Sequence, residues 1–377
     1  MHYSFSTVLM TILASNLIII LITLCFRYEK LMVSVGYRLL AVFLVLTLIR
    51  FLLPFELPFT RTLYLPEFLS IFIFYFRHIF FEGNFFNISL WSIFECIWLI
   101  GALVCLYRHI RTHNGSARYI AAFGRDITGK EPVQTILAEI CGKRKNPFRV
   151  TVIPDLAVPQ IFGFLSPRIL IPDYMDPDSE EFRFSLHHEA YHYFHHDLLI
   201  KEAVNLLCIL YWWNPACRLF RKQVGLILEM HVDDSLVNRD SDVATAYMGS
   251  LIHILETASD RPASIPSDST VALASEETEE LMQRFQMLCH KRSKTRIPMF
   301  LLLLAVVASI YLCSYEIILE AKYTVPAEND STTFNSFTGF YAVLKEDGTY
   351  DLYLNGIFTE NLESLDYYPD IPVLTEE

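Results

Sequence analysis

The residues with the clearest chemical potential form the run His187-His188-Glu189-Ala190-Tyr191-His192. Residues four apart share one face of a helix, so a helix here would offer the imidazoles of His188 and His192 to one metal ion. Glu189 would then lie beside the open coordination position, where a carboxylate acts as a general base in zinc peptidases. The run therefore predicts a zinc peptidase. Because the chain has 12 histidines among 377 residues, such a run also arises by chance, and the surrounding sequence has to decide.

A catalytic zinc needs a third protein ligand, and the segment Glu229-Met230-His231-Val232-Asp233 offers one. Glu229 and Asp233 are four residues apart and share a helix face. Glu229 can bind the metal, while Asp233 steadies a ligand histidine through its second ring nitrogen. Without further context, a solvated acidic face on a surface helix explains these two residues equally well.

The sequence before the histidine run predicts the helix that this chemistry requires. Asp176 and Pro177 form a favourable helix start, as N-cap and first helical residue. Four residues recur at helical spacing and are expected in the core: Phe182, Leu186, Ala190 and Tyr193. Three further histidines nearby fit local solvated or core roles better than catalysis: His187, His195 and His196.

Short strands are predicted before this helix and further helices after it. Arg149–Ile153 is rich in β-branched residues, and Gly163 and Pro167 divide Val158–Pro172 into two more short strands. An extended peptide substrate can pair with the edge of such a sheet, although plain core strands fit these residues as well. Helices are expected at Leu198–Trp213, Pro215–Asn238 and Glu279–His290, with a loop at Ala258–Thr278.

The composition indicates a membrane protein, since 53% of the residues are hydrophobic and they gather in long blocks. A block of about 20 residues crosses the roughly 30 Å of hydrocarbon in a bilayer. Four spans are therefore predicted, at Phe5–Phe26, Leu31–Phe55, Ile88–Tyr107 and Ile297–Tyr315. Leu63–Phe81 is also apolar but contains Pro66 and charged residues, so a surface-lying or re-entrant segment fits it better than a full crossing.

Basic residues at the ends of these blocks predict the orientation. They are Arg27, Lys30, Arg108, Arg111, Lys291, Arg292, Lys294 and Arg296. The positive-inside rule places all of them in the cytoplasm and both termini outside. Four parts follow: a membrane domain at 1–107 with three spans and an outer loop, a cytoplasmic zinc metalloprotease domain at 108–296, a fourth span at 297–319, and a small acidic extracellular β domain at 320–377.

From Ala321 onward the chain carries eleven acidic residues against two lysines, which is most of the formal net charge of −12. This charge argues against nucleic acid as a direct ligand. Alternating residues around Asp347-Gly348 predict a hairpin that binds a ligand or a partner, or that serves as a structural cap. None of the eight cysteines lies in the tail, so free thiols are expected.

Taken together, these motifs resemble the BlaR/MecR-type membrane zinc metallopeptidases, the antirepressor peptidases of bacterial antibiotic-resistance circuits. The resemblance rests on the histidine run with Asp197 and Lys201 after it, on Trp212-Trp213-Asn214-Pro215, on Glu229-x-x-x-Asp233, and on Gly163, Pro167 and Pro172. It implies a gluzincin-like α+β protease in a bacterial cell membrane. It also implies Zn²⁺ on His188, His192 and Glu229, with Glu189 as catalytic base and with Asp233 and Asp197 supporting the ligands.

The resemblance further implies cleavage of the chain itself and of a cytoplasmic winged-helix repressor after an outside signal, with a homodimer as one arrangement. Val232 stands where relatives often have a cysteine, but Glu229 and Asp233 are kept. No Ser-x-x-Lys follows the fourth block, so a covalent β-lactam sensor is not expected. A CAAX-type membrane processing protease and a non-catalytic membrane sensor or scaffold remain alternatives; the former is expected to have more spans.

Overall fold

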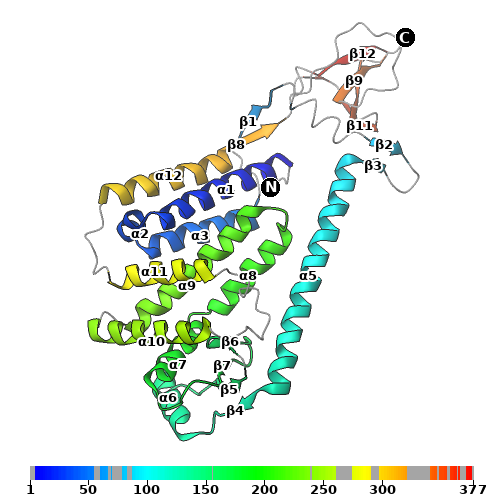
Figure 1. The fold of residues 1–377 in the computed structure, drawn as a ribbon. Coiled ribbons are helices and arrows are strands. Elements are labelled where there is room, and N and C mark those ends of the chain that lie inside the picture. The colour runs from blue at the N-terminus through cyan, green and yellow to red at the C-terminus, as the bar shows by residue number, and fades with distance from the viewer. Residues whose placement is uncertain are drawn as a thin grey trace. The chain divides into compact units, whose positions relative to one another are not determined.

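The computed structural model in Figure 1 describes residues 5–54, 60–66, 69, 79–82, 87–154, 156–237, 240–259, 274–289, 297–320, 340–345, 348–354, 357–362, 364–365 and 371–375. The chain folds into two compact units. The first is Met1–Pro58 together with Leu99–Glu316, and the second is Phe59–Trp98 together with Ile317–Glu377.

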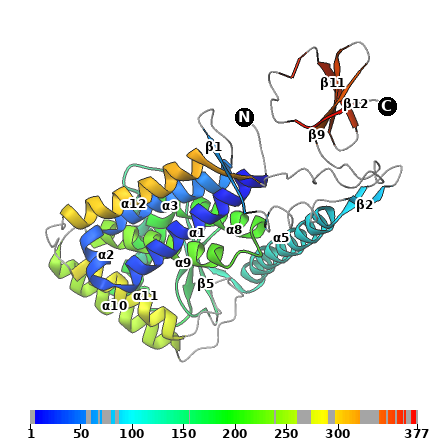
Figure 2. The same ribbon diagram turned by 90° about the horizontal axis from the view of Figure 1, so that it is seen from above.

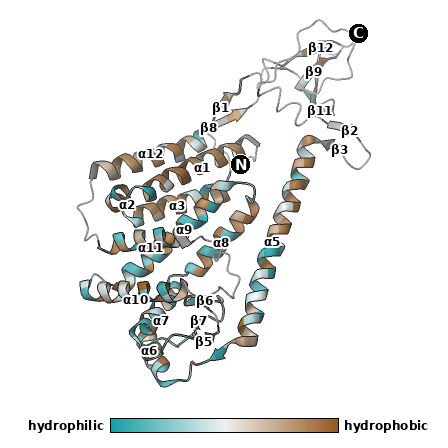
Figure 3. Ribbon diagram, viewed as in Figure 1, coloured by the Kyte–Doolittle hydropathy of each residue, from teal (hydrophilic) through white to brown (hydrophobic). Residues whose placement is uncertain are grey.

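Long apolar helices dominate the first unit, as the brown ribbons of Figure 3 show. They include α1 (Phe5–Arg27), α12 (Ile297–Glu316) and α5 (Leu90–Phe123), which begins in the second unit. Three stretches of these helices are long and apolar enough to cross a membrane, namely Thr7–Arg27, Leu90–Phe123 and Met299–Glu316. They correspond to the first, third and fourth predicted blocks.

Two of the predicted blocks have different bounds in the structure. The second is divided into α2 (Glu29–Val35) and α3 (Tyr37–Leu52) at Gly36, whose φ of 77° is a conformation that glycine adopts readily. The third continues as α5 to Phe123, because hydropathy marks only the apolar part of a helix and not its polar continuation. Within α3, Arg50 is buried and donates hydrogen bonds to Ser314 on α12.

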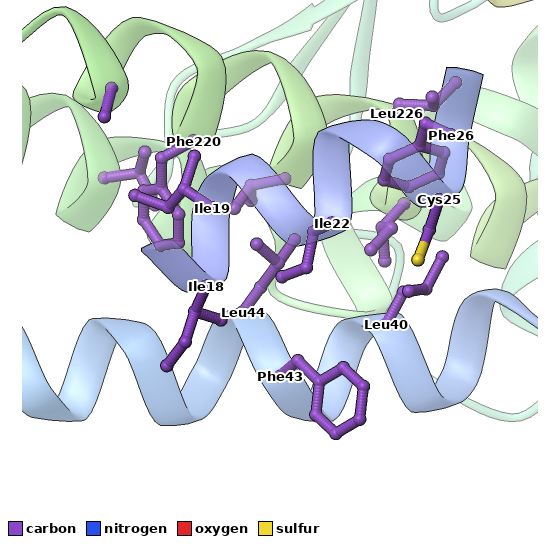
Figure 4. Packing of buried hydrophobic residues seen from close by; sticks show 14 of the residues in the cluster. Ile18, Ile19, Ile22, Cys25, Phe26, Leu40, Phe43, Leu44, Phe220 and Leu226 are labelled. Atoms are coloured by element: carbon purple, nitrogen blue, oxygen red, sulfur yellow. The ribbon is translucent and has the colours of Figure 1, made fainter. Parts of the chain in front are cut away.

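Helices α1, α2, α3 and α12 share one core with the helices that follow the sheet, α8 (Asp197–Leu210) and α9 (Pro215–Val237). Helices α1, α3 and α12 lie side by side in both views of Figures 1 and 2. Figure 4 shows α1 residues such as Ile22 packed beside Leu44 of α3, with Phe220 of α9 close by. In addition, Gln223 of α9 donates a hydrogen bond to the carbonyl of Ile19. Helix α9 is thereby anchored to α1.

A small sheet forms the second core of this unit. Its strands β4 (Arg125–Asp126), β5 (Arg149–Ile153), β6 (Gln160–Phe162) and β7 (Arg168–Pro172) lie in the order β4-β5-β7-β6. β5 pairs parallel with β7, and β6 pairs antiparallel with β7 after a turn at Gly163, whose φ is 86°. The sheet residues Val150 and Ile171 pack against Phe182 and Leu186 of α7 (Glu180–Phe194). The three strands predicted here are present, and β4 is an additional one.

The remaining helices of the unit are α6 (Glu131–Cys141), α10 (Ser241–Ser259) and α11 (Ala274–Cys289). The expected loop at Ala258–Thr278 is shortened by α10 and α11, and its residues 260–273 lie outside the described ones. The prediction that Asp176 caps α7 was wrong. Ser179 is the N-cap and accepts a hydrogen bond from the backbone of Phe182, because Asp176 instead accepts one from the backbone of Asp178 in the preceding turn.

The second unit is built of short strands. β1 (Arg61–Tyr64) pairs parallel with β8 (Ile317–Glu320), and β2 (Ile79–Glu82) pairs antiparallel with β3 (Asn87–Ser89). The strands β9 (Phe340–Leu344), β10 (Tyr350–Leu354), β11 (Ile357–Leu362) and β12 (Val373–Thr375) form a sheet in the order β11-β10-β9-β12. The hairpin predicted around Asp347-Gly348 is therefore present as β9 and β10. The predicted surface-lying or re-entrant segment Leu63–Phe81 lies mostly outside the described residues, with β1 and β2 at its ends.

Candidate metal centre

Helix α7 holds the histidine run between the small sheet and α9. Its Phe182, Leu186 and Ala190 are fully buried in the sheet core, as their spacing predicts. The adjacent face carries His188, Glu189 and His192, and these three side chains are buried as well. Polar groups on a buried helix face need partners to offset their desolvation. The groups that contact this face therefore show which interactions its side chains make.

The side chain of Glu229 on α9 completes a compact group of three potential ligands with His188 and His192. His188 Nε2 lies 3.1 Å from Glu229 Oε2, and His192 Nε2 lies 3.4 Å from Glu229 Oε1. The two Nε2 atoms are 3.2 Å apart. Two atoms bound to one tetrahedral zinc at about 2.0–2.1 Å are about 3.3 Å from each other. The three separations are thus those of a zinc ligand set, and these residues fit the metal.

Hydrogen bonds on the far side of each imidazole keep both Nε2 atoms available as ligands. Asp197, the first residue of α8, lies with Oδ2 2.7 Å from His192 Nδ1. Tyr247 of α10 lies 2.8 Å from His188 Nδ1 and donates a 2.7 Å hydrogen bond to Asp233 Oδ1. These hydrogen bonds favour the ring proton on each Nδ1, so each Nε2 can offer its lone pair to a metal once His192 has lost its second proton. The expected support of a ligand by Asp233 runs through Tyr247, since Asp233 Oδ1 itself is 3.7 Å from His188 Nδ1.

A cavity of about 380 Å³ opens onto this group. Glu189 lines it together with the three potential ligands, and Val158–Ile161 line it as well. Part of that segment belongs to β6, the end strand of the sheet order, whose only partner among the described strands is β7. The cavity thus lies beside a sheet edge, which is one of the two alternatives that the strand pattern left open.

Comparison with known proteins gives the family. Residues 84–288 match the protein family described as BlaR1 peptidase M56, and this stretch is more than half of the chain. The chain belongs to the BlaR1 peptidase M56 family. Over 147 residues it is also 29% identical to the regulatory protein BlaR1 of Bacillus licheniformis. The aligned region covers 38% of this chain and 24% of that protein. The similar region is therefore less than two thirds of the relative's length. Membership of the M56 family implies a metallopeptidase, which agrees with the metal-ligand geometry.

In this M56 peptidase two cations balance the carboxylates of the site. Arg284 of α11 donates two hydrogen bonds of 2.7 Å to Asp233, and its Nη1 lies 3.5 Å from Glu229 Oε2. Lys201 of α8 lies 3.3 Å from Glu229 Oε1. Burial raises the pKa of Glu229, but the charges of His192 and Lys201 outweigh burial and hold it well below its usual value. Glu229 is therefore a carboxylate, the form that binds metals.

The same charges act on the neighbouring groups. Burial lowers the pKa of His192, but the Glu229 charge and the hydrogen bond to Asp197 raise it to about 9 in the metal-free protein. Burial and then the charge of Asp233 raise the pKa of Tyr247 well above its usual value, so its hydroxyl keeps the proton that it donates. A metal ion would have to displace the proton from His192.

Two of these residues, Tyr247 and Arg284, were not predicted from the sequence. Nothing in the local pattern marks Tyr247, because α10 was not predicted and a single tyrosine on an amphipathic helix normally packs. Arg284 lies within a predicted helix, where one arginine is usually solvated, but here its side chain is only 14% exposed. Of the three spare histidines, His187 lies with Nε2 4.0 Å from Glu139 Oε1, and His195 contacts His231.

Proposed function

We propose that this chain is an integral membrane zinc metalloendopeptidase of signal transduction. One observation carries the proposal: His188, His192 and Glu229 form a triangle with the dimensions of a zinc site, beside Glu189 in the same cavity. The apolar helices of the same unit support a membrane location. The distribution of basic residues supports a cytoplasmic position for the site.

In this proposal His188, His192 and Glu229 hold Zn²⁺, which when bound polarises the scissile carbonyl and makes its bound water more acidic. Glu189 takes a proton from the attacking water on its carboxylate and delivers that proton to the leaving amine. Asp197 and Tyr247 hold the two imidazoles in the tautomer that leaves Nε2 unprotonated. Lys201 and His192 keep Glu229 ionised, and Arg284 is the ion-pair partner of Asp233.

The substrate is proposed to be an extended protein segment. A peptide lying in the cavity can pair its backbone with the edge of β6 while the scissile bond reaches Glu189. Following the family, the substrates are this chain itself and a cytoplasmic winged-helix repressor, and cleavage answers a signal received outside. The membership of the M56 family and the similarity to a regulatory protein support this choice over a CAAX-type processing protease.

Replacing Glu189 by Gln tests the proposal. The purified full-length chain is assayed in detergent for zinc content, for self-cleavage by intact-mass spectrometry and for hydrolysis of fluorescein-labelled casein. Loss of the general base should slow cleavage about 10²- to 10⁴-fold while zinc is retained. Glu180→Gln is the matched control, since it makes the same change at an exposed position of the same helix. Cleavage by Glu189→Gln at the wild-type rate would refute the catalytic reading and favour a non-catalytic sensor.

A further inference from the structure

A second group of potential ligands lies next to the proposed zinc site. It consists of His195, Asp197 and His231, whose ligand atoms all lie within 4.8 Å of one another. His195 is the C-cap of α7, Asp197 begins α8, and His231 lies on α9 two residues after Glu229. Helices α7 and α9 therefore contribute to both groups, and α8 adds Asp197 to the second.

The backbone between α7 and α8 is bent in a way that brings this group together. His196 lies between two of its members and has a φ of 61°, the one positive value among the described non-glycine residues. A left-handed conformation is energetically unfavourable for a residue with a side chain. With this bend, His195 and Asp197 on either side of it both approach His231 on α9. The costly conformation thus coincides with the convergence of three metal-binding side chains.

The bonding of His195 is incomplete without a further partner. Its Nδ1 is buried, and no hydrogen-bond partner reaches it in the described part of the chain. A buried polar group left without a partner destabilises the folded state, so such an atom calls for a physical reason. The ring of His195 also lies against that of His231, with 4.3 Å between the centroids. Two imidazoles at this distance repel each other when both are protonated, but neutral imidazoles can bind one cation together.

We propose that His195, Asp197 and His231 form a second metal site, selective for a divalent first-row transition ion such as Zn²⁺. Two imidazoles and one carboxylate suit Zn²⁺, Co²⁺ or Ni²⁺ and not the all-oxygen preference of Ca²⁺ or Mg²⁺. Both histidines are partly exposed, so an ion can enter and keep water at its remaining positions. This site stands on its own residues and does not depend on the proposed peptidase activity.

Asp197 connects the two sites. Its side chain is 1% exposed, and its Oδ2 accepts the hydrogen bond from His192 Nδ1. An ion bound to Asp197 withdraws negative charge from this carboxylate, which weakens the hydrogen bond and makes His192 a poorer ligand. Occupation of the second site therefore lowers activity at the first. This consequence, unlike the site itself, rests on the proposed function: excess zinc is expected to inhibit the peptidase through Asp197.

Metal stoichiometry tests the second site. The full-length chain carrying Glu189→Gln, which prevents self-cleavage, is dialysed against a series of free Zn²⁺ concentrations. Bound zinc is then measured by inductively coupled plasma mass spectrometry. Two ions per chain are expected. The double substitution His195→Gln/His231→Gln should weaken the second ion by more than the 10- to 100-fold that loss of a mere supporting residue costs. The matched control is His187→Gln/His253→Gln, which removes two histidines outside both groups.

The outcomes separate this proposal from the peptidase proposal. In a chain carrying His188→Gln, only the ion that depends on His195 and His231 should remain, even if the first site proves not to bind zinc at all. In the catalytically active chain, inhibition by excess Zn²⁺ should disappear with His195→Gln/His231→Gln. Binding of a second ion that is unaffected by this double substitution would overturn the proposal. So would a single ion that is lost in His188→Gln.

Discussion

Removing the hydroxyl of Tyr247 should weaken metal binding although none of the proposed metal ligands is substituted. In Tyr247→Phe, the ring remains in its buried position while the hydrogen bonds to His188 Nδ1 and Asp233 Oδ1 are both lost. The carboxylate of Asp233 keeps two hydrogen bonds from Arg284, so it stays paired. The loss falls mainly on His188, whose Nδ1 is left with Asp233 Oδ1 at 3.7 Å, too far for a hydrogen bond.

The size of the effect follows from this one unpaired donor. A buried polar group without a partner costs about 1–3 kcal/mol, and each 1.4 kcal/mol is tenfold in a binding constant. Zinc affinity should therefore fall by about 10- to 100-fold, which agrees with the usual loss when the supporting partner of a ligand is removed. Cleavage at saturating zinc should fall much less than in Glu189→Gln, because the general base is still present.

Competition with a zinc chelator of known affinity measures this change in the purified full-length chain. Tyr193→Phe is the matched control, since it removes the hydroxyl of another tyrosine whose ring packs against Phe148, away from the proposed ligands. Its zinc affinity should equal that of the wild type. If Tyr247→Phe also binds zinc with wild-type affinity, Tyr247 does not hold His188 for the metal, and the reasoning from the hydrogen-bond geometry is refuted.

Three further results are expected. Arg284→Gln leaves the buried Asp233 without its cation and should lower the free energy of unfolding, measured by denaturant titration, by about 3–5 kcal/mol. The control Arg183→Gln breaks an exposed ion pair with Glu139 and should lower it by at most about 1 kcal/mol. Burial lowers the pKa of His192, but Glu229 and Asp197 raise it to about 9, so zinc must displace a proton below that pH. The apparent zinc affinity should therefore rise about tenfold per pH unit between pH 7 and 8.5, and a flat affinity profile would contradict the assignment. The stability that this group gives to the metal-free protein is fully present below pH 6.5 and is lost as the pH rises through 9. Finally, green fluorescent protein fused after Cys289 should fluoresce in a bacterial host, whereas fusion after Glu316 should place it outside and abolish fluorescence, since α12 lies between these points.

The sequence predicts well those structural features that depend on the spacing of residues close together in the chain. The faces of α7 follow from residues three and four apart, so the buried Phe182, Leu186 and Ala190 are predicted along with the side-by-side placement of His188 and His192. The apolar strands β5 and β7 follow from their β-branched runs for the same reason.

Other features depend on competition between neighbouring signals. Asp176 and Ser179 both favour a helix start, and the turn that Asp176 stabilises leaves Ser179 as the cap. The second apolar block has the length of a membrane span, but Gly36 divides it, and α3 alone is 16 residues long. A hydropathy pattern counts apolar residues and is insensitive to such a change of backbone direction.

The support of the candidate site could not be predicted because it is tertiary. Tyr247 and Arg284 reach the site from α10 and α11, and nothing within either helix specifies that partner. Their contribution has a physical consequence for signalling. Helix α11 ends at Cys289 and the apolar α12 begins at Ile297, so the cation that keeps Asp233 and Glu229 paired lies on the helix next to a candidate membrane span. A displacement of α11 that withdrew Arg284 would leave the buried Asp233 without its cation, at a cost of about 3–5 kcal/mol. The charge balance of the metal centre therefore depends on the position of α11.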